Sequence, residues 1–249
     1  MPHEHEPQGL HRSRPDAGTP LIELSDYCFA YDEIPVLRHV DLTICAGDSV
    51  VLMGDNGSGK STLLKALVGL IFPQRGSYRF DTQLVDERSM RDASFSKRLH
   101  QRIGYVFQDS DAQLFCASVE DEIAFGPRQM GLSEEEVEQR VDDTCALLDI
   151  TALRKRAPYN LSGGEKKRVA IACVLSMNPD MLCFDEPLSG LDAKTRAWLL
   201  DFLRQLHRAG KTLVIATHDQ SLADEVADYF VFVGEFHGYV DRPHVHINQ

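Results

Sequence analysis

Two short segments far apart in the chain carry small residues and glycines suited to holding phosphate groups. The first, Gly54-Asp55-Asn56-Gly57-Ser58-Gly59-Lys60-Ser61-Thr62, fits the pattern G-x-x-x-x-G-K-[ST]. It follows the apolar run 50–53 and precedes leucines at helical spacing, so strand, loop and helix stand in the order that this chemistry requires. We expect the backbone N–H groups to surround nucleotide phosphates, Lys60 to reach the β- and γ-phosphates, and the Ser61 hydroxyl to bind Mg²⁺.

The second segment is Leu161-Ser162-Gly163-Gly164-Glu165, at the start of a second predicted helix. Ser162 and the N–H groups of Gly163 and Gly164 are predicted to form an anion-binding helix start. The segment lies too far along the chain to belong to the first loop. The sequence therefore predicts two phosphate-binding elements.

Acidic residues follow a buried strand. Asp185 comes directly after the apolar run 181–184, which in a parallel sheet places it at the edge that carries the phosphate loop. It is the predicted Mg²⁺ carboxylate, and Glu186 is the predicted general base for an attacking water. The alternative for Glu186 is a solvated acidic turn before Pro187.

Three further residues complete the predicted site. His218 follows another apolar strand and is placed to contact the γ-phosphate or the attacking water. Gln108 follows the run 103–107 and can touch both Mg²⁺ and water. Tyr31 stands at the end of the first strands, where its ring can stack on a base; the alternative is a core aromatic residue.

Alternating strands and helices predict the elements that position these residues. The pattern is typical of an α/β fold with a parallel sheet wound with helices, preceded by antiparallel strands around residues 22–24 and 40–44. A helical insert is expected from about 95 to 160, with a capping box of Ser133 and Glu136. We expect a flexible tail over 1–19, one domain over 20–236, and a C-terminal tail over 237–249.

Composition narrows the classes of function. The net charge of −12 opposes attraction to nucleic-acid phosphates, so no nucleic-acid partner is expected. Six cysteines without a C-x-x-C pair predict reduced thiols in the cytoplasm. No apolar stretch is long enough to span a bilayer, so work at a membrane would need another chain.

In these residues the chain resembles the nucleotide-binding subunits of ATP-binding cassette (ABC) transporters, over about residues 21 to 236. The motifs occur in the family's order: Tyr31, 54–62, Gln108, 161–165, 181–186, Ser189-Gly190-Leu191-Asp192 and His218. The resemblance implies a P-loop NTPase fold with an antiparallel β subdomain and an inserted α-helical subdomain. It also implies ATP and Mg²⁺ as cofactors, and a second ATPase chain, as in a homodimer, whose segment 161–165 completes each site. Asp192 would communicate across that interface.

A narrower likeness begins at Gln108. The runs 108–115 and 119–127 are similar to the ATPases of energy-coupling factor (ECF) transporters, which serve vitamin uptake or cobalt and nickel uptake. This implies a transmembrane coupling subunit, a substrate-binding membrane subunit, and a peripheral location at the cytoplasmic face of the cell membrane. Residues from about 112 to 125 would meet the coupling subunit; the alternative is ordinary packing of an inserted helix.

The terminal histidines bear on the solute. His3 and His5, and His244 and His246, form H-x-H pairs that could hold Ni²⁺ or Co²⁺ loosely, although solvated tails are the alternative. With the short stretch after His218, they favour cobalt or nickel uptake over vitamin uptake. A soluble ABC-type ATPase of iron-sulfur assembly is the remaining alternative, and the docking-like run 112–125 weighs against it.

Overall fold

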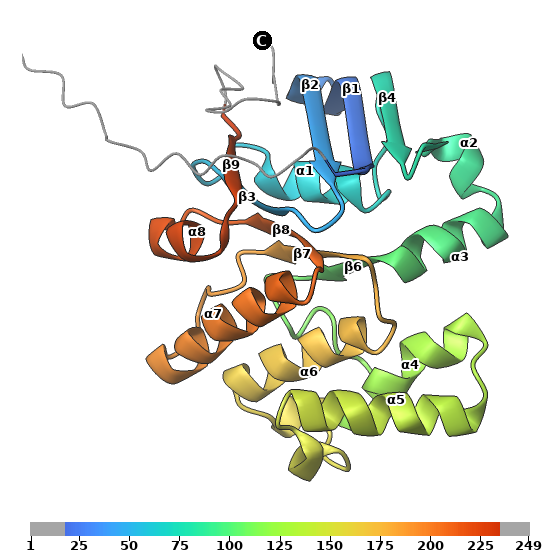
Figure 1. Cartoon of the computed structure of the whole chain (residues 1–249), viewed down its shortest axis with the longest axis vertical. Coiled ribbons are helices and arrows are strands. Elements are labelled where there is room, and N and C mark those ends of the chain that lie inside the picture. The colour runs from blue at the N-terminus through green and yellow to red at the C-terminus, as the bar shows by residue number, and fades with distance from the viewer. Residues whose placement is uncertain (1–17, 235–249) are drawn as a thin grey trace, which may run out of the picture.

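The structure is a computed structural model that describes residues 18–234. The two predicted tails, with His3, His5, His244 and His246, lie outside the described residues except for Gly18 and Thr19. Two sheets stand one above the other, with helix α1 between them and the other long helices below (Figure 1).

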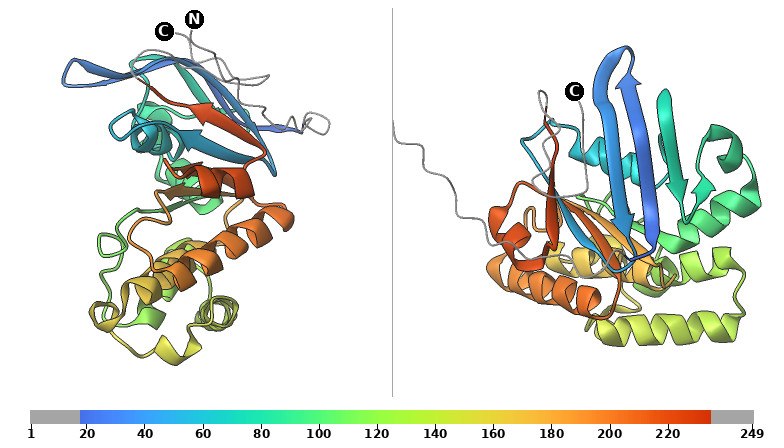
Figure 2. Two further views of the ribbon diagram at one scale, coloured as in Figure 1. Left: turned by 90° about the vertical axis from the view of Figure 1, so that its left-hand side faces the viewer. Right: turned by 45° about the horizontal axis from the view of Figure 1, so that its top comes forward.

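The first sheet is antiparallel, with the strand order β2-β1-β4-β5. Its strands are β1 Pro20–Tyr31, β2 Ile34–Cys45, β4 Arg75–Phe80 and β5 Gln83–Leu84. The long β1–β2 hairpin extends past the rest of the molecule in the turned views (Figure 2). This confirms the expected antiparallel strands near the nucleotide loop.

The second sheet is parallel, with the order β6-β7-β8-β3-β9. Its strands are β3 Ser49–Met53, β6 Ile103–Val106, β7 Met181–Asp185, β8 Thr212–Ala216 and β9 Tyr229–Phe232. The helices are α1 Lys60–Leu67, α2 Glu87–Met90, α3 Ala93–Arg102, α4 Val119–Met130, α5 Glu134–Leu147, α6 Gly163–Leu175, α7 Ala193–Arg208 and α8 Gln220–Val226, with short 3₁₀ turns η1 Thr151–Leu153 and η2 Pro158–Asn160. The predicted α/β fold class is confirmed.

Each inner strand of the parallel sheet contributes to two hydrophobic cores, because successive side chains point to opposite faces. In β7, Met181 and Cys183 join the core shared with α1 and the antiparallel sheet. Leu182 and Phe184 join the core formed with the helices below. This double burial explains why these strands appear in the sequence as continuous apolar runs.

The helical insert begins later than expected. Residues 103–106 form strand β6, which pairs with β7 in the parallel sheet, so the boundary at about residue 95 is replaced by one after β6. Gly104 allows the close approach that this requires, since a Cβ there would lie 2.2 Å from Cγ1 of Val174 on α6. The capping box of Ser133 and Glu136 is confirmed at the start of α5.

Among residues 18–234, no helix combines the length and the apolar character needed to cross a membrane.

Candidate functional site

The loop between β3 and α1 is shaped by glycines. Gly54 has φ of 149°, and a Cβ there would lie 2.1 Å from the carbonyl oxygen of Val233. Gly59 has φ of 102° and caps α1 without any side-chain hydrogen bond, so the first N–H groups of the helix are left for another partner. Asp55, Asn56 and Gly57 are exposed at the turn.

Lys60 and Ser58 indicate what that partner is. Lys60 is buried, and its Nζ donates to the carbonyl oxygens of Gly54 at 2.6 Å and Asp55 at 2.9 Å. Ser58 Oγ is buried without a hydrogen-bond partner in the described part of the chain. A buried cation and an unsatisfied hydroxyl beside a free helix start fit the phosphates of a nucleotide.

Asp185, at the end of β7, meets the loop as its place in the parallel sheet predicts. Ser61 Oγ donates to Asp185 Oδ1 at 2.9 Å, and the Tyr105 hydroxyl donates to Oδ2 at 3.1 Å. Burial raises the pKa of Tyr105, which keeps this phenol protonated and able to donate. A serine hydroxyl and a carboxylate are hard oxygen ligands of the kind that Mg²⁺ prefers, so these two residues fit a Mg²⁺ ion.

Glu186 is held by three neighbours. Its Oε2 accepts from Thr217 Oγ1 at 3.1 Å, and its Oε1 lies 2.9 Å from His218 Nδ1 and 3.9 Å from Lys60 Nζ. Its φ of 41° lies in the left-handed region, which costs a non-glycine residue about 1–3 kcal/mol. With a side chain only 12% exposed, Glu186 is a fixed acceptor and not a solvated acid in a turn.

Gln108 stands apart from this group. It is exposed just after β6, and its side chain makes no hydrogen bond to Asp185 or Ser61 in the described structure. Its backbone carbonyl accepts from Lys167 Nζ at 2.9 Å, and the carbonyl of Phe107 accepts from the same amine at 3.1 Å. Burial lowers the pKa of Lys167 to about 8. Lys167 therefore fixes the segment in which Gln108 stands.

The second predicted phosphate-binding segment starts α6. Ser162 is the N-cap, and its Oγ accepts from Glu165 N while the Glu165 carboxylate accepts from Ser162 N at 2.7 Å and from Ser162 Oγ at 2.8 Å. The bond from the Ser162 N–H is the main reason that the pKa of Glu165 is lowered. Glu165 thus orients Ser162, and the N–H groups of Gly163 and Gly164 remain at the open end of the helix.

Asp192 lies beside this helix start. It caps α7, accepting from Lys194 N at 2.9 Å, Thr195 N at 3.0 Å and Thr195 Oγ1 at 2.8 Å. A Cβ on Gly164 would lie 2.6 Å from Thr195 Oγ1, so the starts of α6 and α7 are in close contact. Residues 162–165 and 190–192 line one hollow, in which no residue of the phosphate loop takes part.

The first turn of α7 also reaches the other group of residues. Arg196 forms an ion pair with Asp219, the neighbour of His218 and the N-cap of α8. Partial burial acts to raise the pKa of Asp219. The hydrogen bond from Arg196 is the main opposing effect, and the pKa of Asp219 lies below its usual value.

Tyr31 ends β1 at the turn of the hairpin, where Asp32 and Glu33 have φ of 43° and 70°. Its ring is 42% exposed and meets Phe29 edge to face, with the ring centroids 4.8 Å apart. Tyr31 is thus not a core residue.

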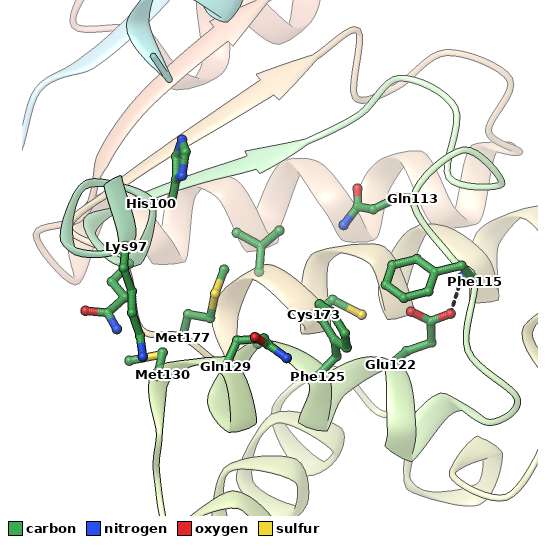
Figure 3. A pocket seen from close by; sticks show the side chains of 13 residues that line it. Lys97, His100, Gln113, Phe115, Glu122, Phe125, Gln129, Met130, Cys173 and Met177 are labelled. Atoms are coloured by element: carbon green, nitrogen blue, oxygen red, sulfur yellow. Dashed lines mark hydrogen bonds between the residues drawn. The ribbon is translucent and has the colours of Figure 1, made fainter. Parts of the chain in front are cut away.

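A cavity of about 290 Å³ lies between α3, α4 and α6 (Figure 3). Phe115 and Phe125 stand at its side with rings 70% and 45% exposed and centroids 5.2 Å apart. Glu122, itself buried, accepts from the N–H groups of Phe115 and Cys116, which fixes the preceding loop to α4. The cavity walls are mostly apolar, including Met130 and Met177.

The structure thus brings together Lys60, Ser61, Asp185, Glu186 and His218, and separately Ser162, Gly163, Gly164 and Asp192. Three positioning residues were not predicted: Tyr105 and Thr217, which contact Asp185 and Glu186, and Lys167, which holds the segment of Gln108. Tyr105 lies in strand β6, which was expected inside the helical insert, and Thr217 stands directly before His218. Lys167 lies between Lys166 and Arg168, and no local pattern in this basic run distinguishes it from its neighbours.

The fold and the first group of residues define a P-loop nucleotide-binding ATPase domain. The family model described as ABC transporter matches residues 37–189, and the chain belongs to the ABC transporter family. It is an ABC ATPase of the energy-coupling factor type, in which ATP hydrolysis is coupled to transport, and a nickel import ATPase is among its relatives.

Three similar proteins support the assignment to this family. The nickel import ATP-binding protein LarO of Lactiplantibacillus plantarum is 46% identical over 87% of this chain and 90% of its own length. The structure of cbiO1 from Clostridium perfringens, part of the ABC transporter complex cbiONQ, has a TM-score of 0.79 at 33% identity, over 92% of this chain and 88% of that one. The dimeric ATP-binding cassette MJ0796, bound to ADP and Pi, has a TM-score of 0.78 at 27% identity, over 92% and 99% of the two chains.

Proposed function

We propose that this chain powers the uptake of nickel or cobalt through a membrane partner, by binding and hydrolysing Mg-ATP in a homodimer. The observation that carries the proposal is the division of the phosphate-binding residues into two groups that do not meet within one chain. The relationship to a nickel import ATPase, nearly full length in both chains, supports the choice of solute.

Within one chain, each residue of the first group has a role that its contacts favour. The loop 54–62 and Lys60 hold the phosphates, while Ser61 and Asp185 hold Mg²⁺, which would offset the charge on the β- and γ-phosphates. Glu186 accepts the proton of the attacking water, and His218 orients that carboxylate through its Nδ1. Gln108 reaches this group only if its segment moves on nucleotide binding, and Tyr31 stacks on the base.

The second group acts on the nucleotide of another copy. The N-terminus of α6, with Ser162 and the N–H groups of Gly163 and Gly164, is open and can bind an anion. Asp192 lines the same hollow, whereas the phosphate loop of the same chain does not. Two chains arranged head to tail would place each such helix start on the γ-phosphate of the ATP that the other chain binds. The dimeric structure of a similar cassette with ADP and Pi supports this arrangement.

Mixing two inactive variants tests the shared site. Lys60→Ala removes the phosphate amine and Ser162→Arg blocks the helix start, so neither homodimer has an intact site, whereas a mixed dimer has one. We expect the mixed dimers to retain labelled ATP at about half the wild-type amount per dimer, which is about a quarter when averaged over all dimers of an equal mixture, and neither variant alone to retain it. If the mixture retains no ATP although each variant is folded, the shared site is wrong.

The cavity beside Phe115 is the proposed contact with the transmembrane coupling subunit. The exposed rings of Phe115 and Phe125 form an apolar surface bounded by the polar side chains Lys97 and Gln129, which suits a short helix of the partner. Ordinary packing of an inserted helix would have buried these rings. The substrate-binding membrane subunit would be held through the coupling subunit, with this chain at the cytoplasmic face of the membrane.

Purification from membranes tests this contact. Phe115→Asp should release the membrane subunits while ATP binding remains, and Leu147→Asp, at a residue 59% exposed on α5, is the matched control that should not. Cells that express the complex should then take up radiolabelled nickel or cobalt in an ATP-dependent way. Uptake of a vitamin instead would contradict the solute, and activity without any membrane partner would contradict the transport role.

A further inference from the structure

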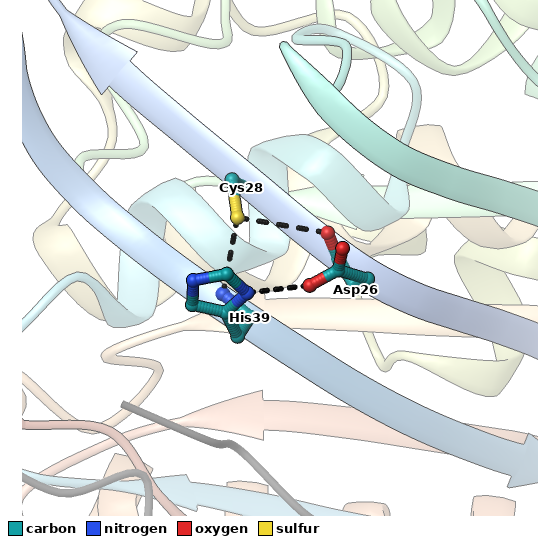
Figure 4. Close-up of side chains that lie close together, drawn as sticks. All are labelled: Asp26, Cys28 and His39. Atoms are coloured by element: carbon teal, nitrogen blue, oxygen red, sulfur yellow. Dashed lines mark hydrogen bonds and ion pairs between the residues drawn. The ribbon is translucent and has the colours of Figure 1, made fainter.

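Three side chains of different chemistry meet on the β1–β2 hairpin, away from the residues discussed so far (Figure 4). They are Asp26 and Cys28 on β1 and His39 on β2, and their carboxylate, sulfur and ring-nitrogen atoms all lie within 4.8 Å of one another. His39 Nδ1 lies 2.5 Å from Asp26 Oδ1, and His39 N donates to Cys28 Sγ at 3.2 Å. All three are half-buried or exposed at the surface, so small solutes can reach them.

The hairpin is irregular where these residues meet. The β1–β2 register shifts between Leu24 and Tyr27 and again before Phe29, and both Asp26 and His39 have φ near 50°. Each left-handed non-glycine residue costs about 1–3 kcal/mol. The distortion is fixed from the other side by Gly76 of β4, where a Cβ would lie 2.2 Å from the carbonyl oxygen of Asp26. Two strained residues on facing strands turn their side chains toward one point.

The three groups offer a carboxylate oxygen, a sulfur and a ring nitrogen to one point. Arg75 Nε lies 2.7 Å from Asp26 Oδ2. Arg75 occupies Oδ2 and leaves Oδ1 toward His39. The backbone N–H of His39 points at the Cys28 sulfur, which in turn lies 3.6 Å from the carbonyl oxygen of Asp26.

We propose that Asp26, Cys28 and His39 bind one divalent transition-metal ion of the Zn²⁺, Co²⁺ or Ni²⁺ class, with water in the remaining position. Thiolate and imidazole ligands select this class over Mg²⁺ or Ca²⁺. Ligands at about 2.0–2.3 Å from a tetrahedral ion lie roughly 3.3–3.8 Å apart. Small rotations therefore suffice, which widen the contact between His39 and Asp26 and close the sulfur onto the ion. Binding releases the thiol proton of Cys28, while the neutral imidazole of His39 binds the ion through Nδ1 and carries its proton on Nε2.

A surface ion pair explains less of this arrangement than a metal site does. Asp26 already has Arg75 and His39 as partners, and neither contact needs a sulfur atom directed to the same place. The site is also separate from the phosphate loop, and it involves none of the residues assigned to ATP. It therefore stands whether or not the solute of the transporter is a metal.

Titration of the full-length chain with Co²⁺ tests the site, because a thiolate ligand gives a sulfur-to-cobalt charge-transfer band that histidine tails cannot give. We expect the band to saturate at one Co²⁺ per chain. Cys28→Ser should abolish it, whereas Cys116→Ser, at another half-buried cysteine, should leave it unchanged. His39→Gln and Asp26→Asn keep the thiol and should weaken Co²⁺ binding about 10- to 100-fold or more.

Absence of the band in the wild-type chain, or its survival in Cys28→Ser, overturns the proposal. Thermal unfolding with and without Co²⁺ gives a second measurement, since binding to the folded chain alone must raise the wild-type Tm and not that of Cys28→Ser. If Cys28→Ser does not fold, His39→Gln and Asp26→Asn decide: unchanged Co²⁺ affinity in both would also overturn the proposal.

Discussion

Lys167 is a buried amine, and burial destabilises its protonated form. It is 2% exposed, and its Nζ reaches the backbone carbonyls of Phe107 and Gln108. Burial lowers its pKa from 10.5 to about 8, against smaller opposing effects of Asp109 and Asp185. We predict that replacing it with methionine removes a specific pH dependence of the free energy of unfolding.

The size of the effect follows from the pKa shift. One pKa unit corresponds to about 1.4 kcal/mol, so a change from 10.5 to about 8 makes the charged form about 3 kcal/mol costlier in the folded chain. Below pH 8 the amine is protonated in both states and the whole penalty is present. As pH rises through 8 toward 10.5 only the unfolded chain keeps the proton, so stability rises. Between pH 7 and about pH 9.5 the gain is about 2 kcal/mol.

Equilibrium urea unfolding of wild type and Lys167→Met at these two pH values measures this gain. The wild-type free energy of unfolding minus that of the variant should increase by about 2 kcal/mol, because other titrating groups cancel in the difference. Lys166→Met removes a positive charge from the same helix at a side chain that pairs with Asp111, and it should not reproduce the increase. A difference that stays constant across the range would refute the account of Lys167.

Three further outcomes are expected. Glu186→Gln should keep ATP binding and slow hydrolysis by about 10² to 10⁴, the range for loss of a general base, in a steady-state phosphate-release assay; wild-type turnover would remove Glu186 from that role. Asp185→Asn should raise the Mg²⁺ concentration needed for half-maximal hydrolysis at least tenfold, and an unchanged Mg²⁺ titration would place the metal elsewhere. Gly164→Ala should lower the free energy of unfolding by about 1–3 kcal/mol through its clash with Thr195, whereas Gly163→Ala, which has open space, should not; equal thermal shifts would contradict the close contact.

The parts predictable from sequence were those whose signals are local. The phosphate loop, the capping box at Ser133, the helix start at Ser162, and the strand that ends at Asp185 each depend on residues a few positions apart. A parallel sheet then brings Asp185 to Ser61, although 124 positions separate them, because strand ends share one edge.

What could not be predicted depends on tertiary contacts without a local pattern. Residues 103–106 are a short run containing a glycine, and only the packing of α6 on Gly104 explains why they form a sheet strand and not part of the insert. Tyr105 reaches Asp185 over 80 positions and Lys167 reaches Gln108 over 59, and no periodicity announces such pairs. The meeting of Asp26, Cys28 and His39 depends on two bulges, which leave no mark in the alternation of apolar residues.

The first turn of α7 contacts Gly164 through Thr195 and Asp219 through Arg196, and Asp219 adjoins the histidine that holds Glu186. In the proposed dimer this turn therefore connects the helix start that binds one nucleotide with the carboxylate that acts on the other nucleotide. We therefore expect occupancy of one site to alter the competence of the second, which is a coupling free energy between sites. Turnover should accordingly rise with ATP concentration more steeply than a hyperbola, with a Hill coefficient above one, and Arg196→Ala should return the curve toward independent sites.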